Sequence, residues 1–535
     1  MKFKLICVAV FAAFTFSACV TDNGNNNRNN SNPSDAAYIS LTVETPNVPG
    51  SRASAEEPAT STENAIKTLR AVVFDSNLQV IKHDKATQVV QELAGFDNTG
   101  TATEEKTNAF VVPGSSKYLL IIANPGPELK ARLDAMIVGT AFSTVNAAVK
   151  NTGTPLNVSE INGANGFTMI NSGVGATSDT DPTSPAVLAL VDLTGKIQVV
   201  SGNVTDDDAK TEAEKDANRV QVKIERLSSK IEVAEVSGGA ATVEYEDKTV
   251  DPAVTVSPEF NFTSWVTDVV NTQFFPWAKK VALASTPSNA SFYAKNFYVI
   301  DPNYDNNEGI AYNDVDVAFP TGAGITTPVY VIENTMKADE QDNDKATRVV
   351  IKATYYPNPA WKTGSADWFS YGGIDYKSLE MMVEAYKAEA APQNLKDACD
   401  RFFLVVKGIS DGGSGSITVT KFEDLTQAML TGLAITDGGQ KVREGDPDCI
   451  WWYQGGLCYY YFPIKHDDAA TNANEFAKYG VVRNNWYDCT ITKVKGAGTP
   501  WYPEIDDNPI DETEGYISAT INIGPWVKWS TNYEI

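Results

Sequence analysis

The chain has 535 residues, which at about 150 residues per domain is enough for two to four domains. Its 43 lysines and arginines against 68 aspartates and glutamates give a net charge of −25, which repels a phosphate backbone, so nucleic acid is not an expected partner. With only two histidines, the chain has little to offer for histidine-based metal sites or acid–base catalysis.

Residues 1–18 have the pattern of a signal peptide, with two early lysines, the apolar run Leu5–Phe16 and the small pair Ser17-Ala18. Cys19 follows directly, and the four residues that end in it resemble a bacterial lipobox, in which the cysteine is lipidated. The alternative is an ordinary secretory signal followed by an unrelated cysteine. No later run reaches the roughly 18 apolar residues of a membrane helix, so we expect attachment through lipid. The asparagine-rich residues 22–35 predict a solvated tether.

Short alternating segments predict an all-β chain with minor helix. The first is Tyr38–Glu44, where Ile39, Leu41 and Val43 share one face, which is typical of a half-buried strand. Similar runs bounded by Gly, Pro, Asn and Asp recur along the chain and favour β-sandwiches. The further predicted strands are Leu69–Phe74, Ala109–Val112, Tyr118–Ala123, Val187–Val191, Val220–Ile224, Phe292–Ile300, Val329–Ile332, Arg348–Tyr356, Phe402–Val406, Ser416–Thr420, Tyr459–Ile464, Trp486–Val494 and Tyr516–Ile523.

One segment clearly predicts a helix, Lys377–Glu389, and its apolar stripe indicates core packing. The stripe consists of Leu379, Met382, Val383 and Tyr386. A polar connector, Asp206–Arg219, is a second possible helix. It leads into a strand that ends near Ile231, where we expect the main domain boundary. The predicted division is a signal peptide (1–18), a lipidated tether with the first strand (19–52), an N-terminal sandwich (53–232) and a C-terminal sandwich (233–535).

The motifs that could carry chemistry are weak, so we predict no catalytic residue, no metal site and no cofactor. Gly412–Gly415 lacks the setting of a dinucleotide site and predicts a surface hairpin turn. Asp301, Asp305 and Glu308 could offer oxygens to calcium, but their spacing does not match an EF-hand, and a solvated loop is the preferred interpretation. Four later cysteines fit no metal spacing, which leaves disulfides and buried free thiols equally open. They are Cys399, Cys449, Cys458 and Cys489.

Three stretches resemble the fimbrillins of the Bacteroidales, particularly the shaft subunits of minor fimbriae. They are Val329–Thr335 (VYVIENT), Val481–Tyr487 (VVRNNWY) and the segment from Arg226 to Ile231. The resemblance implies two tandem transthyretin-like β-sandwich domains and a structural subunit of a pilus that supports adhesion. It also implies an outer membrane lipoprotein precursor, with a lipid such as palmitate on Cys19, that ends in a cell-surface fimbrium.

In that family an arginine-specific or trypsin-like protease removes the first strand, and a C-terminal strand of another subunit fills the groove. For this chain the resemblance implies cleavage between Arg52 and Ala53, in a Pro/Gly loop where Arg52 is the one basic residue between Arg28 and Lys67. The implied partners are other copies of the chain, accessory tip and anchor subunits, the protease and, before processing, the outer membrane.

The implied donor residues alternate along the last predicted strand, and the segment Trp526–Ile535 follows them. They are Ile517, Ala519, Ile521 and Ile523. The alternative is a terminal hairpin that stays in its own sandwich. Other functions remain open at this stage: an exported hydrolase, for which the sequence shows no set of convergent carboxylates, a fimbrial tip or anchor subunit, and a surface glycan-binding lipoprotein. In the last of these, Trp451–Tyr453 and Tyr459–Tyr461 would form a sugar-stacking platform, whereas burial within strands is the competing interpretation.

Overall fold

A computed structural model of the chain is the basis for the structural description. It describes residues 35–45, 60–97, 99–100, 102, 104–151, 158–173, 176–235, 242–243, 257–283, 297–305, 309–313, 318–322, 326–414, 417–431, 433, 448–467, 470, 472, 475–510 and 517–525. The signal peptide, Cys19, the tether, the Arg52–Ala53 bond and Trp526–Ile535 lie outside the described residues.

The N-terminal unit is built from an eight-stranded sheet and a three-stranded sheet, with β1 (Ala36–Ile39) in the small sheet and β2 (Leu41–Glu44) in the large one. The order of the large sheet is β4 (Gln91–Glu92), β3 (Leu69–Phe74), β7 (Tyr118–Ala123), β11 (Met169–Asn171), β14 (Val220–Arg226), β2 and β5 (Glu104–Lys106), with β12 (Val191–Asp192) beside β7. The small sheet is β13 (Gln198–Val199), β1 and β6 (Phe110–Pro113).

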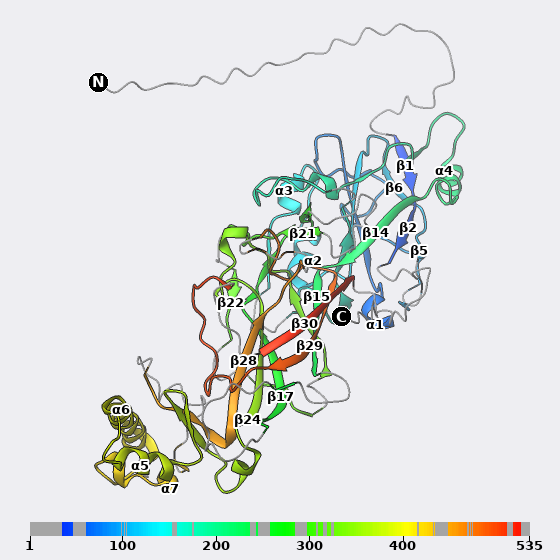
Figure 1. The fold of residues 1–535 in the computed structure, drawn as a ribbon. Coiled ribbons are helices and arrows are strands. Elements are labelled where there is room, and N and C mark those ends of the chain that lie inside the picture. The colour runs from blue at the N-terminus through cyan, green and yellow to red at the C-terminus, as the bar shows by residue number, and fades with distance from the viewer. Residues whose placement is uncertain are drawn as a thin grey trace, which may run out of the picture.

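Leu227 separates β14 from β15 (Ser228–Glu235), and at this residue the chain passes from the N-terminal sheet to the sheets of the C-terminal unit (Figure 1). The larger C-terminal sheet has the order β16 (Thr242–Val243), β29 (Asn485–Val494), β15, β23 (Val329–Ile332), β18 (Val270–Asn271) and β22 (Ile310–Ala311), with β30 (Ile517–Pro525) beside β29. The second sheet is β17 (Glu259–Asp268), β24 (Arg348–Tyr356) and β28 (Leu457–Pro463).

The two C-terminal sheets enclose one core. Ile231 and Val233 of β15 and Tyr487 of β29 pack in the same cluster as Val349 and Ile351 of β24. Alternate residues of each strand therefore point into a common interior, which is the arrangement of a β-sandwich. The predicted strands Leu69–Phe74, Tyr118–Ala123, Val329–Ile332 and Arg348–Tyr356 are confirmed with the same bounds.

A helical lobe lies between β24 and β28 in the chain and forms one end of the molecule (Figure 1). The prediction of α5 (Leu379–Lys387) is confirmed, including the buried Leu379, Met382 and Val383. The predicted strand Phe402–Val406 is wrong, because these residues lie within α6 (Gln393–Ile409). The rest of the lobe consists of α7 (Gln427–Thr431) and the strands β25 (Trp368–Tyr371), β26 (Ile374–Tyr376) and β27 (Trp451–Tyr453).

Three smaller predictions are also corrected. Val187–Val191 is mostly a 3-10 turn, with only Val191 in a strand. No strand covers Ile417–Thr420, the described part of the predicted Ser416–Thr420 strand. The glycine run after α6 begins within a π-helical turn, Ser410–Ser414, and not in a hairpin turn. Among the described residues, no helix is long and apolar enough to cross a membrane.

Candidate assembly site at the first strand

The first strand of the chain runs through both sheets of the N-terminal unit and has hydrogen-bonded neighbours on both edges. β1 lies antiparallel to β6 and to β13, with Ala37 opposite Val112 and Val199. After Ser40 the chain continues as β2, which is parallel to β14 and antiparallel to β5. Because both edges are occupied, removing this strand would leave unpaired ladders on two sides of one groove.

The inner face of the strand fills the core of the N-terminal unit, as predicted. Ile39, Leu41 and Val43 are each 0% exposed and belong to one buried cluster with residues of β3, β7 and β14. At about 1.5 to 3 kcal/mol for each fully buried side chain, these three residues make a large contribution to holding the strand in place.

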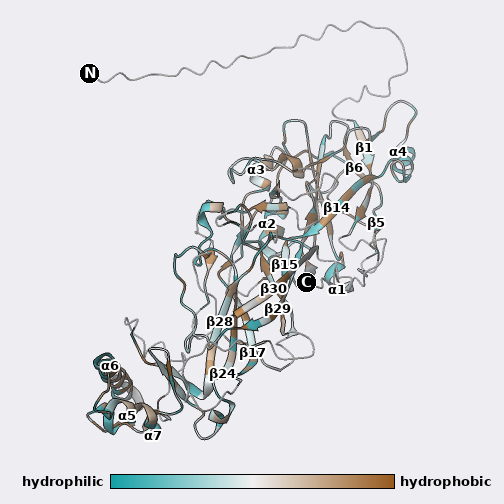
Figure 2. Cartoon of the chain, viewed as in Figure 1, coloured by the Kyte–Doolittle hydropathy of each residue, from teal (hydrophilic) through white to brown (hydrophobic). Residues whose placement is uncertain are grey.

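The outer face is also buried, which corrects the prediction of a half-buried strand. A short helix, α4 (Asp206–Ala213), covers it, and Tyr38 packs against Ala209 and Ala213. The hydroxyl of Ser40 donates a hydrogen bond of 2.7 Å to the carbonyl oxygen of Ala213. In Figure 2 α4 is largely hydrophilic. The alternation within Tyr38–Glu44 therefore gives no sign that two alanines of a polar helix cover the outer face of the strand.

α4 has its own N-terminal cap, and Arg219, which follows the helix in the chain, contacts β2 directly. The Thr205 hydroxyl accepts the Asp208 N–H at 3.2 Å, and the Asp208 carboxylate accepts the Thr205 N–H at 3.0 Å. Arg219, which is buried, donates to the carbonyl oxygens of Leu41 at 3.2 Å and Thr107 at 2.7 Å. One guanidinium therefore joins β2 to the chain that follows β5. We call α4 together with Arg219 the clasp.

The last described strand, β30, has a different environment. It pairs with β29 alone among the described strands, from Asn485 opposite Pro525 to Val494 opposite Ile517. Ile517 is buried, and Ala519 and Ile521 are partly buried against the C-terminal core. The structure thus places the predicted donor residues in their own sandwich in the single chain, with Ile523 opposite Tyr487 in the ladder.

The three sequence motifs meet where the N-terminal and C-terminal units join. Glu333 and Arg483 form a fully buried, two-pronged ion pair, and Arg483 also donates at 2.7 Å to the carbonyl oxygens of Phe275 and Pro276. Arg226 donates through Nε to the carbonyl oxygen of Glu63 at 3.0 Å. The main-chain N–H of Arg226 donates to Asn484 at 3.2 Å.

Burial shifts the pKa values of these groups. It lowers the pKa of Arg226 to about 10, against the opposing effect of the Glu63 carboxylate. Burial raises the pKa of Glu333, whereas the pKa of Arg483 is raised because the attraction of Glu333 outweighs the effect of burial. An ion pair in this setting is costly to break, because either partner left alone would be a buried, unpaired charge. The motif residues therefore act as the joint between the two units.

The prediction of a solvated loop is wrong at Asp301, because this residue is fully buried. Its carboxylate accepts hydrogen bonds from the main-chain N–H groups of Thr335 and Asn303, both at 2.7 Å. Burial, followed by the nearby Glu333 charge, raises the pKa of Asp301 to about 8. Among the described residues no group of three or more His, Cys, Asp and Glu side chains is placed to hold a metal ion.

Four of the six rings predicted for a sugar-binding platform are buried, and only Trp451 and Tyr461 are partly exposed. Trp452, Tyr453, Tyr459 and Tyr460 are buried, and the Tyr453 ring stacks on Trp368 at 3.7 Å between ring centres. These rings therefore contribute to cores and cannot present flat faces to a sugar.

The open question about the cysteines is also decided. All four late cysteines are buried free thiols. Burial raises the thiol pKa of Cys399 and Cys458 to about 12, which keeps them protonated and unreactive.

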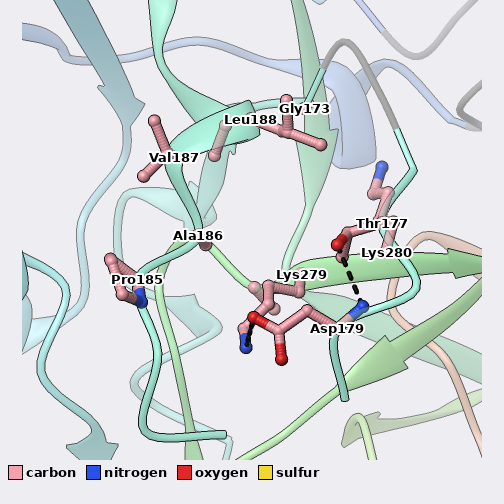
Figure 3. Close-up of a pocket in the computed structure, with 11 residues that line it drawn as sticks. Gly173, Thr177, Asp179, Pro185, Ala186, Val187, Leu188, Lys279 and Lys280 are labelled. Atoms are coloured by element: carbon pink, nitrogen blue, oxygen red, sulfur yellow. Dashed lines mark hydrogen bonds and ion pairs between the residues drawn. The ribbon is translucent and has the colours of Figure 1, made fainter. Parts of the chain in front are cut away.

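A cavity of about 190 Å³ opens beside the joint (Figure 3). Lys279 and Lys280 lie at its wall, but both have carboxylate partners: Asp179 is 3.1 Å from Lys279, and Glu225 forms a buried pair with Lys280. Figure 3 shows Lys279 and Asp179 pointing toward one another across the cavity wall. The lysines therefore stabilise the joint and leave no free cation aimed into the cavity.

Comparison with known proteins identifies both ends of the chain. Residues 37–226 match the family model for the major fimbrial subunit protein (FimA), and residues 452–532 match the model for the C-terminal part of major fimbrial subunit protein type IV, fimbrillin. No curated protein sequence matches the chain significantly.

Solved structures give further likenesses. A fimbrilin (FimA) from Porphyromonas gingivalis W83 is 13% identical, with 92% of this chain and 98% of that chain covered and a TM-score of 0.37. The tip fimbrial protein Mfa3 from Porphyromonas gingivalis, with a C-terminal truncation, is 13% identical, with 92% and 100% covered and a TM-score of 0.37.

The two matched regions include the first strand, β1–β2, and the last described strand, β30, respectively. The first match begins in β1 and ends at Arg226, and so includes the groove and the clasp. The second begins in β27 and extends past β30. The helical lobe lies almost wholly between the two matches. The chain belongs to the fimbrillin family of structural fimbrial subunits, whose matched models describe subunits and not enzymes.

Proposed function

We propose that this protein is a shaft subunit of a cell-surface fimbrium that polymerises by exchange of its first strand. In this proposal the chain is exported, lipidated at Cys19 and cut between Arg52 and Ala53, after which Tyr38–Glu44 leaves the N-terminal unit. The β30 region of another copy then enters the groove. Family membership carries the coarser statement, that the chain is a fimbrial subunit whose partners are other fimbrial subunits.

The observation that supports exchange is the position of the first strand. It is the one segment that lines the core with Ile39, Leu41 and Val43 while being followed at once by the predicted cleavage loop. A groove with two unpaired edges and an empty apolar floor is a strong acceptor for an extended segment, because main-chain bonds and side-chain pockets act together.

The shaft assignment depends on both ends of the chain. A tip subunit needs no free donor strand, and an anchor needs no cleavage, whereas this sequence offers both Arg52 in a segment rich in Pro and Gly and a long C-terminal strand. A glycan-binding lipoprotein is not favoured, since four of the six aromatic residues it would use are buried.

N-terminal sequencing of the polymer extracted from the cell surface tests the proposal. We expect the mature chain to begin at Ala53 and to lack both the lipid and Tyr38–Glu44. Polymer that retains Cys19 with its lipid would indicate an anchor. Mature protein that begins at Ala53 but never forms polymers would refute strand exchange between copies and leave the cleavage standing.

A further inference from the structure

Two segments at opposite ends of the chain carry nearly the same sequence. Tyr38–Glu44 reads YISLTVE, and Tyr516–Asn522 reads YISATIN. The tyrosine, isoleucine, serine and threonine are identical, and the remaining inner positions exchange one apolar residue for another. An alternating strand requires apolar residues on one face only. It does not require the same tyrosine, serine and threonine in the same order on the other face.

We propose that Tyr516–Asn522 is a copy of the first strand and enters the groove of another subunit in one register, with Tyr516 in the place of Tyr38. In this register α4 selects the incoming strand by its outer face, whereas Arg219 binds the main-chain carbonyl oxygen at the Leu41 place, which any strand offers. The proposal rests on the strand exchange proposed above and adds to it which residues take which places.

The outer face supplies the selection. Tyr38 lies against Ala209 and Ala213, and Ser40 donates to the carbonyl oxygen of Ala213. A strand that places Tyr516 and Ser518 there brings the same ring and the same donor. A slip of one residue would turn the apolar face outward. A slip of two would put Ser518 in the Tyr38 place and leave the space against Ala209 unfilled.

The inner face of Tyr516–Asn522 matches that of the first strand at two of its three positions. Ile517 replaces Ile39, and Ile521 replaces Val43, so two of the three core positions keep a branched apolar side chain. Ala519 replaces Leu41, which is fully buried, and so leaves a gap in the N-terminal core. The resident strand therefore fills the groove better than its copy does. This explains why exchange would require the resident strand to be cut free first.

The edge of the groove adds a second difference. Lys223 of β14 forms an ion pair with Glu44 at 3.3 Å, and the copy carries Asn522 at that position. Because Lys223 is exposed, this pair contributes little. Ile523 lies beyond the seven matched residues.

The register can be read by disulfide capture, because Gln221 of β14 is exposed and lies directly opposite Thr42. The test uses the chain from residue 20 onward, with Gln221→Cys and a specific protease site inserted between Arg52 and Ala53. Cutting the folded protein leaves the first strand bound but free to exchange. The described native cysteines are buried, so the new thiol is the accessible one among them.

Synthetic peptides of residues 516–525 are then added under mild oxidation. In the proposed register, the cysteine of the Thr520→Cys peptide lies directly opposite residue 221 on the neighbouring strand. Paired strands are about 4.8 Å apart, which is within the range of Cα–Cα distances that a disulfide can span. Peptides with Ser518→Cys or Asn522→Cys have their thiol on the same face but two residues away, at about 7 to 8 Å. A peptide of residues 36–45 with Thr42→Cys is the positive control, since that pairing is observed directly.

We expect the Thr520→Cys peptide to be captured at least about tenfold more than the other two, and an added Ala519→Leu change to tighten binding about tenfold. Equal capture of all three peptides, or capture led by Ser518→Cys or Asn522→Cys, overturns the register. If the first-strand peptide binds and no 516–525 peptide does, the donor lies elsewhere and the proposal is wrong.

The outcomes that would refute the proposed function differ from those that would refute the register. If the Thr520→Cys peptide is captured selectively but the cut protein forms no polymer, strand exchange between subunits is refuted and the register remains. If polymer forms while the captured register differs, the function remains and the copy is not the donor in this register.

Discussion

The first strand, β1–β2, and the last described strand, β30, share an alternating sequence but are held in different ways. β1–β2 has paired strands on both edges, a fully buried inner face and the clasp on its outer face. β30 pairs with β29 alone among the described strands, and Ala519 and Ile521 are only partly buried. The comparison teaches that the pattern of a strand does not determine how readily it leaves its domain. We expect the number of occupied edges and covered faces to determine it.

The largest expected effect comes from placing a charge on the inner face of each strand. Leu41→Asp puts a carboxylate into a fully buried site with no partner, and we expect a loss of more than about 4 kcal/mol, enough to unfold the N-terminal unit. Ile521→Asp, on the partly buried strand, is expected to leave the single chain folded while preventing polymer formation. Thermal unfolding followed by circular dichroism, together with electron microscopy of polymer, measures both effects.

The matched control is Thr42→Asp, on the other face of β2, which is buried but lies beside the exposed Gln221. It should cost less than Leu41→Asp. If Ile521→Asp unfolded the chain as completely as Leu41→Asp, the two strands would be held equally and the comparison would be wrong.

The sequence predicts the sandwich strands well and the helical lobe poorly, for a physical reason. In a strand such as Val220–Arg226, buried and exposed residues alternate from Val220 to Ile224, so periodicity alone reveals it. Phe402–Val406 is an unbroken apolar run, which fits a buried strand or a helix equally well. The helical period becomes visible only over the longer span of α6, where Leu395, Cys399, Phe402 and Val406 are buried.

The assembly site was predicted only in part. Alternation predicted the inner face of Tyr38–Glu44, but burial of Tyr38 and Ser40 depends on α4, which lies about 170 residues later in the chain. Glu333 and Arg483 lie in separate motifs, and no feature of the sequence around either residue shows that they pair across 150 positions. The likeness between Tyr38–Glu44 and Tyr516–Asn522 is fully present in the sequence, and comparing the chain with itself could have found it.

The second prediction concerns the clasp, for which β30 has no counterpart among its described contacts. Arg219→Met removes the hydrogen bonds to the carbonyl oxygens of Leu41 and Thr107 and should lower the free energy of unfolding by about 1.5 to 3 kcal/mol. It should also speed release of the first strand after cleavage. Urea denaturation and the rate of peptide release measure these effects. Lys130→Met, at an exposed ion pair, is the control and should change stability by less than about 0.5 kcal/mol.

The third prediction concerns the joint, which connects the N-terminal unit to the C-terminal unit. Glu63 is buried beside Lys230 and Arg226, and its pKa is lowered because hydrogen bonds from Thr60 and these two cations outweigh the effect of burial. A carboxyl with a lowered pKa in the folded state contributes stability above its unfolded pKa of 4.5 and loses it as the pH falls through the folded value. Glu63→Gln should therefore cost about 1 to 2 kcal/mol at pH 7.

The difference between the wild type and Glu63→Gln should begin to shrink below about pH 4.5, where the carboxyl of the unfolded chain becomes protonated, and should be lost once the pH falls below the lowered pKa of the folded chain. Urea denaturation at a series of pH values measures it. Glu423→Gln, which loses an exposed pair with Lys421, serves as the control. A difference that stays constant down to acid pH would show that the charge of Glu63 does not stabilise the joint.

The smallest effect tests whether the two strands are equivalent at their outer faces. Ser40→Ala removes the donor to the carbonyl oxygen of Ala213 and should cost the uncut chain about 1 kcal/mol, because one buried hydrogen bond is lost. If Ser518 takes the place of Ser40 after exchange, Ser518→Ala should weaken binding of a 516–525 peptide by the same amount, about fivefold in affinity. Changing serine to alanine at either place removes the same donor from the same carbonyl group, so the two losses should agree. A loss at Ser40 with none at Ser518 would show that the copy enters the groove without meeting the clasp, and the selection would then have to come from the inner face alone.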